Sequence, residues 1–98
     1  MTGLPKNLQK VLWSWNLKDI DKKRDKNLII TQVFNWGNED LVCWVLKNYS
    51  VDEIRQVVGK PRRGMWWKRV LNFWMKILDV KIRENDFEKA VLNINPVI

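Results

Sequence analysis

The residues of this chain best suited to chemistry are cations and indole rings gathered in one short segment. The stretch "GKPRRGMWWKR" holds five basic residues and two adjacent tryptophans in eleven positions. Lysine and arginine are the usual contacts to phosphate groups, whereas indole rings either fill a core or stack on a partner. The segment is therefore either a core element with a solvated edge or a surface that contacts an anionic partner.

The positive charge of the chain is concentrated around this segment. The 98 residues carry 18 Lys and Arg against 11 Asp and Glu, a net charge of +7. Seven of the basic residues lie between Arg55 and Leu78, where there is no acid, so the remaining eleven basic residues balance the eleven acids. A clustered excess of this kind is typical of a nucleic-acid-binding surface.

The residue types needed for catalysis or metal binding are scarce. There is no histidine, and Cys43 is the only cysteine, which excludes a disulfide within the chain and the usual Cys/His zinc site. The paired carboxylates, Asp19 with Asp21 and Asp52 with Glu53, lie at predicted helix starts or in loops, where helix capping explains them. We therefore expect no enzyme activity and no cofactor.

The apolar pattern indicates neither a membrane span nor a signal peptide. No uninterrupted apolar run approaches the ~18 residues of a spanning helix, and the N-terminus lacks an apolar signal core. The single cysteine fits a reducing compartment, and its place in the apolar run "LVCWVL" predicts a buried side chain. We expect a cytoplasmic protein without a membrane partner.

Helical periodicity runs through the chain and predicts an all-α fold, a compact bundle of about five short helices. The first predicted helix begins at Pro5, has an apolar side that reaches Trp15, and ends near Asn16. The others span about residues 25–36, 38–49, 50–58 and 65–78. The third of the five is apolar nearly all round, which predicts that it lies at the centre of the bundle.

The chain divides into a helical domain, residues 1–78, and a C-terminal tail, residues 79–98. The tail has a weak helical pattern, with at most one short helix around residues 86–92. Its apolar side chains are Val91, Leu92, Ile94, Val97 and Ile98. Two alternatives stay open for the tail, which either packs back on the bundle or is ordered by a partner.

The helix predicted at residues 65–78 separates a basic face from an apolar one. At 100° per residue, one arc of the helix holds Met65, Lys68, Arg69, Asn72 and Lys76. Trp67 and Trp74 fall on the opposite side, and we expect them to be buried together with Trp44. Trp66 lies at the boundary, where it is either core or a contact for stacking or for a partner.

A short capped helix, a basic turn and a longer basic helix make the arrangement of a helix-turn-helix unit. In such a unit the second helix enters the major groove and the turn lies near the phosphates. The predicted nucleic-acid-binding residues are Lys60, Arg62, Arg63, Met65, Lys68, Arg69, Asn72 and Lys76. Lys60, Arg62 and Arg63 would contact phosphates. The side chains that would face base edges are Met65, Lys68, Arg69 and Asn72, with Lys60 and Lys76 at the periphery. The alternative is that the basic face only keeps the helix solvated.

Beyond these patterns, the order "LWSWNLKDIDKKRDKNLIITQVFNWGNEDLVCWVLKNYSVDEIRQVV…RR…NFW" resembles a family of small bacterial proteins described only as a domain of unknown function. The matching residues are Trp13, Trp15, Ile29, Ile30, Gly37, Trp44, Leu46, Tyr49, Ser50, Glu53, Arg62, Arg63, Asn72, Phe73 and Trp74. The likeness covers Leu12 to about Leu78. It implies a helix-turn-helix protein, similar in some members to antitoxins encoded beside nucleotidyltransferase-type toxins. One departure is that Gly64 and "MWW" stand where the pattern has Ser or Thr opening the last helix.

We therefore expect a DNA-binding helix-turn-helix protein, an antitoxin-like transcriptional regulator that reads double-stranded DNA with helix 65–78. A protein-interaction module that neutralises a toxin without specific DNA readout is the first alternative. Single-stranded nucleic-acid binding, with Trp66 as the stacking platform, is the second. Double-stranded DNA is the expected partner, and a cognate toxin and a homodimer stay open.

Overall fold

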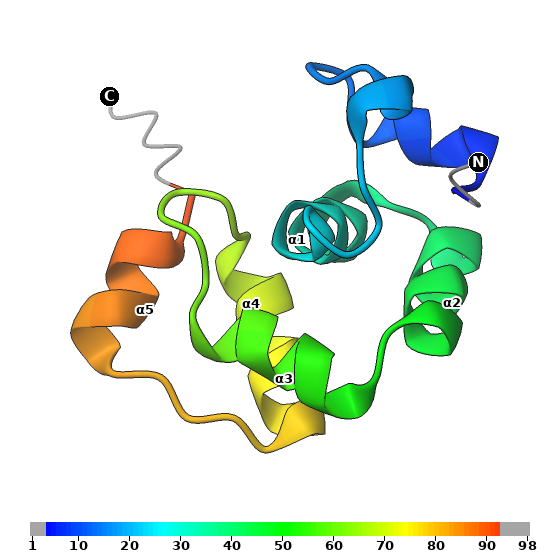
Figure 1. The fold of residues 1–98 in the computed structure, drawn as a ribbon. Coiled ribbons are helices and arrows are strands. Elements are labelled where there is room, and N and C mark those ends of the chain that lie inside the picture. Colours follow the sequence, from blue (N-terminus) through cyan, green and yellow to red (C-terminus); the bar gives the residue numbers. More distant parts are fainter. Residues whose placement is uncertain (1–3, 93–98) are drawn as a thin grey trace.

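The computed structural model describes residues 4–92, which fold into five α-helices preceded by two short 3-10 turns (Figure 1). The helices are α1 Lys26–Trp36, α2 Glu39–Asn48, α3 Val51–Gly59, α4 Lys68–Leu78 and α5 Glu84–Ala90, and the 3-10 turns are η1 Lys6–Lys10 and η2 Leu17–Asp19. No β-strand forms within residues 4–92, where Trp66 and Val91 make a single isolated bridge. The prediction of an all-α bundle of about five helices is confirmed. No helix of this described part is long and apolar enough to cross a bilayer.

Helix α1 lies at the centre of the bundle, between α2 on one side and the α3–α4 pair on the other (Figure 1). Seven consecutive residues of α1, from Leu28 to Phe34, are buried. Two of them, Thr31 and Gln32, are polar, and Gln32 donates its side-chain amide to the Val11 carbonyl at 2.7 Å. That hydrogen bond satisfies the buried amide of Gln32, so α1 can be buried all round over residues 28–34 despite its two polar positions.

The prediction that the helix over residues 38–49 is central is therefore wrong. Within α2 only Leu41 and Val45 are buried, and Leu46 is half exposed. Cys43 lies off the stripe formed by these two residues and is exposed, contrary to the prediction of a buried thiol. Apolar residues such as Cys43 and Leu46 made α2 look enclosed, although both are exposed.

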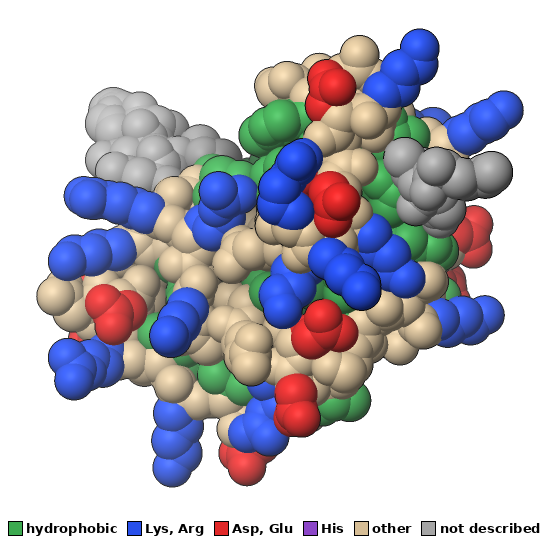
Figure 2. All heavy atoms as spheres, in the orientation of Figure 1, with side chains coloured by type: hydrophobic (Ala, Val, Ile, Leu, Met, Phe, Trp, Pro, Cys, Tyr) green, Lys and Arg blue, Asp and Glu red, His purple; other side chains and the backbone are tan. Residues whose placement is uncertain are grey.

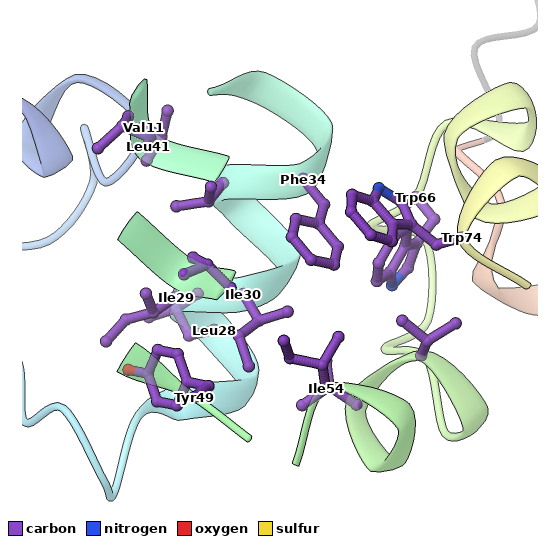
Figure 3. Packing of buried hydrophobic residues seen from close by; sticks show 14 of the residues in the cluster. Val11, Leu28, Ile29, Ile30, Phe34, Leu41, Tyr49, Ile54, Trp66 and Trp74 are labelled. Carbon is purple, nitrogen blue, oxygen red and sulfur yellow. The ribbon is translucent and has the colours of Figure 1, made fainter. Parts of the chain in front are cut away.

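Between α1 and α4 the core is aromatic (Figure 3). Phe34 of α1 stacks on Trp74 of α4 with ring centroids 3.9 Å apart and planes 7° apart, and Trp66 meets Phe34 edge-on at 6.4 Å. The predicted trio of buried tryptophans is correct only for Trp74. Trp44 and Trp67 are partly buried, whereas Trp66 is fully enclosed.

The exchange between Trp66 and Trp67 has a backbone cause. Helix α4 begins at Lys68 rather than at Met65, and Trp67, its N-cap, has extended dihedral angles (φ −68°, ψ 134°). Successive side chains of an extended segment point to opposite sides. The two tryptophans therefore point to opposite sides, instead of lying about 100° apart as on a helix, and Trp66 is the one that points inward.

The C-terminal tail holds this segment extended. The Trp66 N–H donates to the Ala90 carbonyl at 3.0 Å, the Leu92 N–H donates to the Trp66 carbonyl at 2.6 Å, and the Gly64 N–H donates to the Lys89 carbonyl at 2.9 Å. Ala90 is buried. Of the two alternatives for the tail, packing on the bundle describes it as far as Leu92. Ile94, Val97 and Ile98 lie outside the described residues.

The first predicted helix is much shorter than expected. Only Lys6–Lys10 is helical, as a 3-10 turn, and Trp15 is exposed. The Gln9 side chain donates to the carbonyls of Leu12 and Trp15 and accepts from the Leu17 N–H. One amide thus satisfies backbone groups that a longer helix would have paired internally, so the chain can turn there.

Candidate nucleic-acid interface

All the basic residues predicted to bind nucleic acid are at the surface. The exposed residues of the predicted set are Lys60, Arg62, Arg63, Lys68, Arg69, Asn72 and Lys76, and Met65 is partly buried. The ion pairs of residues 4–92 are Arg24–Asp25 and Lys26–Glu53, so none of the predicted cations is neutralised by one. Figure 2 shows Lys and Arg side chains spread over one face of the molecule, with fewer Asp and Glu among them.

The outward side of α4 gathers most of the predicted base-reading residues. Leu71 and Trp74 anchor the inner side of the helix in the core. On the outer side a shallow hollow of about 530 Å³ is lined by Lys68, Arg69, Asn72, Phe73 and Lys76. We call these five residues the α4 basic face. Two cations near the start of the helix, one amide and one further cation offer hydrogen-bond donors of the kind that contact phosphates and base edges.

Phe73 is the member of this face that the sequence did not predict. The helical wheel put it on the flank of the apolar arc, but its side chain is 53% exposed and touches Trp74 edge-on at 5.3 Å. Ile77, one turn further on, is also exposed. Because α4 buries only a narrow stripe, two large apolar side chains remain on its outer surface. Phenylalanine and isoleucine are not residue types that a sequence motif would mark as functional, so Phe73 and Ile77 were not predicted as site residues.

Met65 does not belong to the α4 basic face. It precedes the helix, after Gly64, whose φ of +69° turns the chain. The turn cations are also separated from the face. Arg62 lines a different hollow, of about 440 Å³, with residues from the N-terminal loop and the start of α1, among them Asp19 and Asp25. The structure thus divides the predicted set into a helical group and a turn group.

The surroundings of Asp25 show where Arg62, one of the turn cations, lies. A hydrogen bond from the Arg24 side chain is the main reason why the pKa of this carboxyl lies below its ordinary value, followed by the Asp21 N–H and, more weakly, the charge of Arg62. Arg62 therefore shares its surroundings with a carboxylate, although the sequence around it contains no acid. Lys60, the C-cap residue of α3, and Arg63 line neither hollow.

Acids reach the α4 basic face from α5 as well. Glu84 and Glu88 line a hollow of about 420 Å³ together with Lys68 and Asn72. The face is thus bordered by carboxylates on its α5 side. Residues 55–78 contain no acid in the sequence, but in the fold two carboxylates of α5 lie next to this segment.

The two remaining expectations concern the start of α4 and Trp66. No side chain caps α4, so the N–H groups of its first turn are available to an anion, and the positive end of the helix dipole points the same way. Trp66 is 0% exposed, so its ring has no open surface for stacking on a base or for contact with a partner. No group of three or more His, Cys, Asp or Glu among residues 4–92 is placed to hold a metal ion.

Comparison with known proteins gives one result. No curated protein and no solved structure matches the chain. Residues 8–58, just over half of the sequence, match the profile of a family described as "Family of unknown function (DUF6922)". The match includes α1, α2 and most of α3, and ends before the turn cations and α4. The matched segment thus contains the central helix α1 with α2 and most of α3, and the chain belongs to the DUF6922 family.

Proposed function

We propose that this protein binds double-stranded DNA through the α4 basic face, as an antitoxin-like transcriptional regulator of the helix-turn-helix type. The observation that carries the proposal is the α4 basic face itself. Its three cations are exposed without ion pairs in the described residues, on a helix whose opposite side is fixed in an aromatic core. A rigid helix with donors on its outer side fits the major groove.

The packing of α3 against α4 supports the helix-turn-helix part of the proposal. Helix α3 begins with a capping box, in which Ser50 and Glu53 each accept the other's backbone N–H. The connection from Lys60 to Trp67 is longer than the turn of about three to four residues in the tightest units. The longer connection reverses the chain direction and also has room for three cations, Lys60, Arg62 and Arg63.

Each residue of the α4 basic face has a role in the proposal. Arg69 pairs with guanine and Asn72 with adenine, the bidentate contacts that their side chains favour, while Lys68 and Lys76 contact phosphates on either side. Phe73 packs against a thymine methyl group. The three turn cations bind phosphates outside the groove, Arg62 most weakly because of its neighbouring carboxylates.

Fluorescence anisotropy with labelled duplexes at several salt concentrations tests the proposal. Arg63→Ala should weaken all duplexes alike and reduce the log–log salt slope by about 0.9. Arg69→Ala should also blur the ranking of sequences, by about 1–3 kcal/mol at one base pair. Lys47→Ala, which removes an exposed charge from α2, is the control and should behave as wild type.

Duplexes selected from a random pool supply the sequence ranking. If wild-type protein enriches no sequence and loses no more affinity on Arg69→Ala than on Lys47→Ala, the α4 basic face is only a solvated surface. The proposal includes a cytoplasmic location and a homodimer that reads a two-fold symmetric site. The alternative function, neutralisation of a toxin without DNA readout, is tested by co-purification with the product of the neighbouring gene.

A further inference from the structure

Three tryptophans from distant parts of the sequence meet at the surface. Trp13 and Trp36 lie edge-to-face with ring centroids 5.5 Å apart, and Trp36 and Trp67 lie edge-to-face at 5.3 Å. Trp13 is 59% exposed and Trp36 43% exposed, and Trp67 is partly buried. We call these residues the tryptophan strip. A group of large apolar rings at a protein surface usually marks a site that a binding partner covers.

The backbone under the strip is fixed at each ring. Trp36 is the last residue of α1, and Trp67 is the N-cap of α4. The Trp67 backbone N–H donates to the side-chain oxygen of Asn35 at 2.8 Å. Trp13 lies in the turn that the Gln9 amide closes through the carbonyls of Leu12 and Trp15. Rings on a rigid backbone lose little conformational entropy when a partner packs on them, which favours binding.

The charge beside the strip indicates what kind of partner fits. Lys68 and Arg69 follow Trp67 directly, and both are exposed and outside the ion pairs of residues 4–92. The whole chain carries +7, so a second copy would bring like charges together. A partner with carboxylates next to its apolar side chains complements this surface.

The ring geometry favours a protein over a nucleic acid. Bases stacked along a strand are parallel, whereas neighbouring rings of the strip are inclined by 85° and 63°. Two successive bases therefore cannot stack on two neighbouring rings at once. Aliphatic and aromatic side chains pack equally well against ring faces and edges.

From these observations we infer that the tryptophan strip docks an acidic segment of a partner protein. The segment places an apolar or aromatic side chain against Trp13 and Trp36, and its carboxylates face Lys68 and Arg69. The three rings lie outside the outer hollow of α4, whereas Lys68 and Arg69 belong to both surfaces, so a docked acidic segment would compete with DNA for these two cations.

Panning a phage-displayed random peptide library on the full chain tests the inference, followed by titration of the enriched peptides in labelled form. The peptides should combine a large apolar residue with Asp or Glu. Their affinity should fall about tenfold or more on Trp13→Ala and on Trp36→Ala, and also on Lys68→Glu. Trp15→Ala removes an exposed indole that makes no ring contact in the described residues, and it should bind like wild type.

Three results would overturn the inference. Peptides that bind Trp13→Ala as tightly as wild type do not occupy the strip. Oligothymidylate that displaces them and itself depends on Trp13 makes the strip a base platform. A wild-type dimer in sedimentation analysis that dissociates on Trp13→Ala makes a second copy the occupant. Trp13→Ala removes a mostly exposed ring, so its thermal melt should match wild type, and its duplex binding should too, which separates this test from that of the proposed function.

Discussion

Phe34 and Trp74 stack almost parallel, 3.9 Å apart, and join the central helix to the helix that carries the basic face. Trp74→Ala removes one of these rings and opens a cavity in the core. The expected loss is about 3–5 kcal/mol of unfolding free energy, enough to unfold a domain this small. Urea denaturation followed by circular dichroism measures it. Ile77→Ala, which trims an exposed side chain of the same helix, is the control, and equal midpoints for the two variants would contradict this packing.

At Gly37, directly after α1, the backbone lies so close to the last turn of the helix that a side chain would not fit. A Cβ atom at this position would lie 2.6 Å from the Val33 carbonyl oxygen, which cannot move without disturbing α1. Gly37→Ala should therefore destabilise the fold by about 1–3 kcal/mol. Gly59 is the matched control, because a Cβ there meets only Val80 at 3.4 Å and alanine suits a helix better by up to about 1 kcal/mol. Thermal melts of both variants should shift in opposite directions.

Acid should weaken the start of α3. The Ser50 N–H, donated to the Glu53 carboxylate, is the main reason why the Glu53 pKa lies below its ordinary value of 4.5, with Lys26 contributing less. A lowered folded-state pKa means that the ionised form stabilises the fold fully above about pH 4.5 and that this contribution is lost as the pH falls through the folded-state pKa. The pKa values of Asp21 and Asp25 are lowered in the same sense.

Thermal melts between about pH 7 and pH 3 follow this loss, and NMR titration of the Glu53 carboxyl locates it. Glu53→Gln should melt lower than wild type at neutral pH and lose less stability in acid. The control is Glu88→Gln, an exposed residue whose side chain makes no hydrogen bond or ion pair within residues 4–92. An unchanged pH profile for Glu53→Gln would show that this carboxylate does not couple to folding.

The α5 carboxylates should oppose DNA binding. If DNA lies on the α4 basic face, then Glu84→Gln combined with Glu88→Gln removes two negative charges from its border. Affinity for any duplex should rise about two- to fivefold at low salt, and the gain should shrink as salt screens it. Glu39→Gln with Asp40→Asn makes the same charge change on α2, at the far side of the bundle from α5 (Figure 1). Equal gains for both double variants would indicate a general charge effect instead of a bordered site.

Helical periodicity predicted the bundle because the α1, α3 and α4 segments each carry an apolar helical pattern, and because α2 and α3 also carry their own N-caps. Asn38 caps α2 and Ser50 caps α3 as their residue types suggest. The predictions failed where a side-chain hydrogen bond or a contact with a distant segment determines the structure instead of the local sequence pattern. Gln32 lets α1 be buried all round, and Gln9 ends the first helix early.

The candidate site was predictable only in part for the same reason. The alternation of helix faces identified Lys68, Arg69, Asn72 and Lys76 as one outer group, and the structure keeps them together. It could not show that Arg62 lines a hollow together with Asp25, since the two residues are far apart in the sequence. Nor could it show that pairing with residues 90–92 keeps Trp66 extended and exchanges its place with Trp67.

The pairing of Trp66 with the tail also sets an order on folding during synthesis. Residues 8–58 include α1, α2 and most of α3, and they leave the ribosome before α4 and the tail. Trp66 has no backbone partner until Ala90 and Leu92 have emerged. In a chain still being translated, the extended segment at Trp66 therefore lacks these two hydrogen bonds until α5 has emerged. A pause in translation after α4 would leave the bundle without this pairing, as an incompletely folded intermediate.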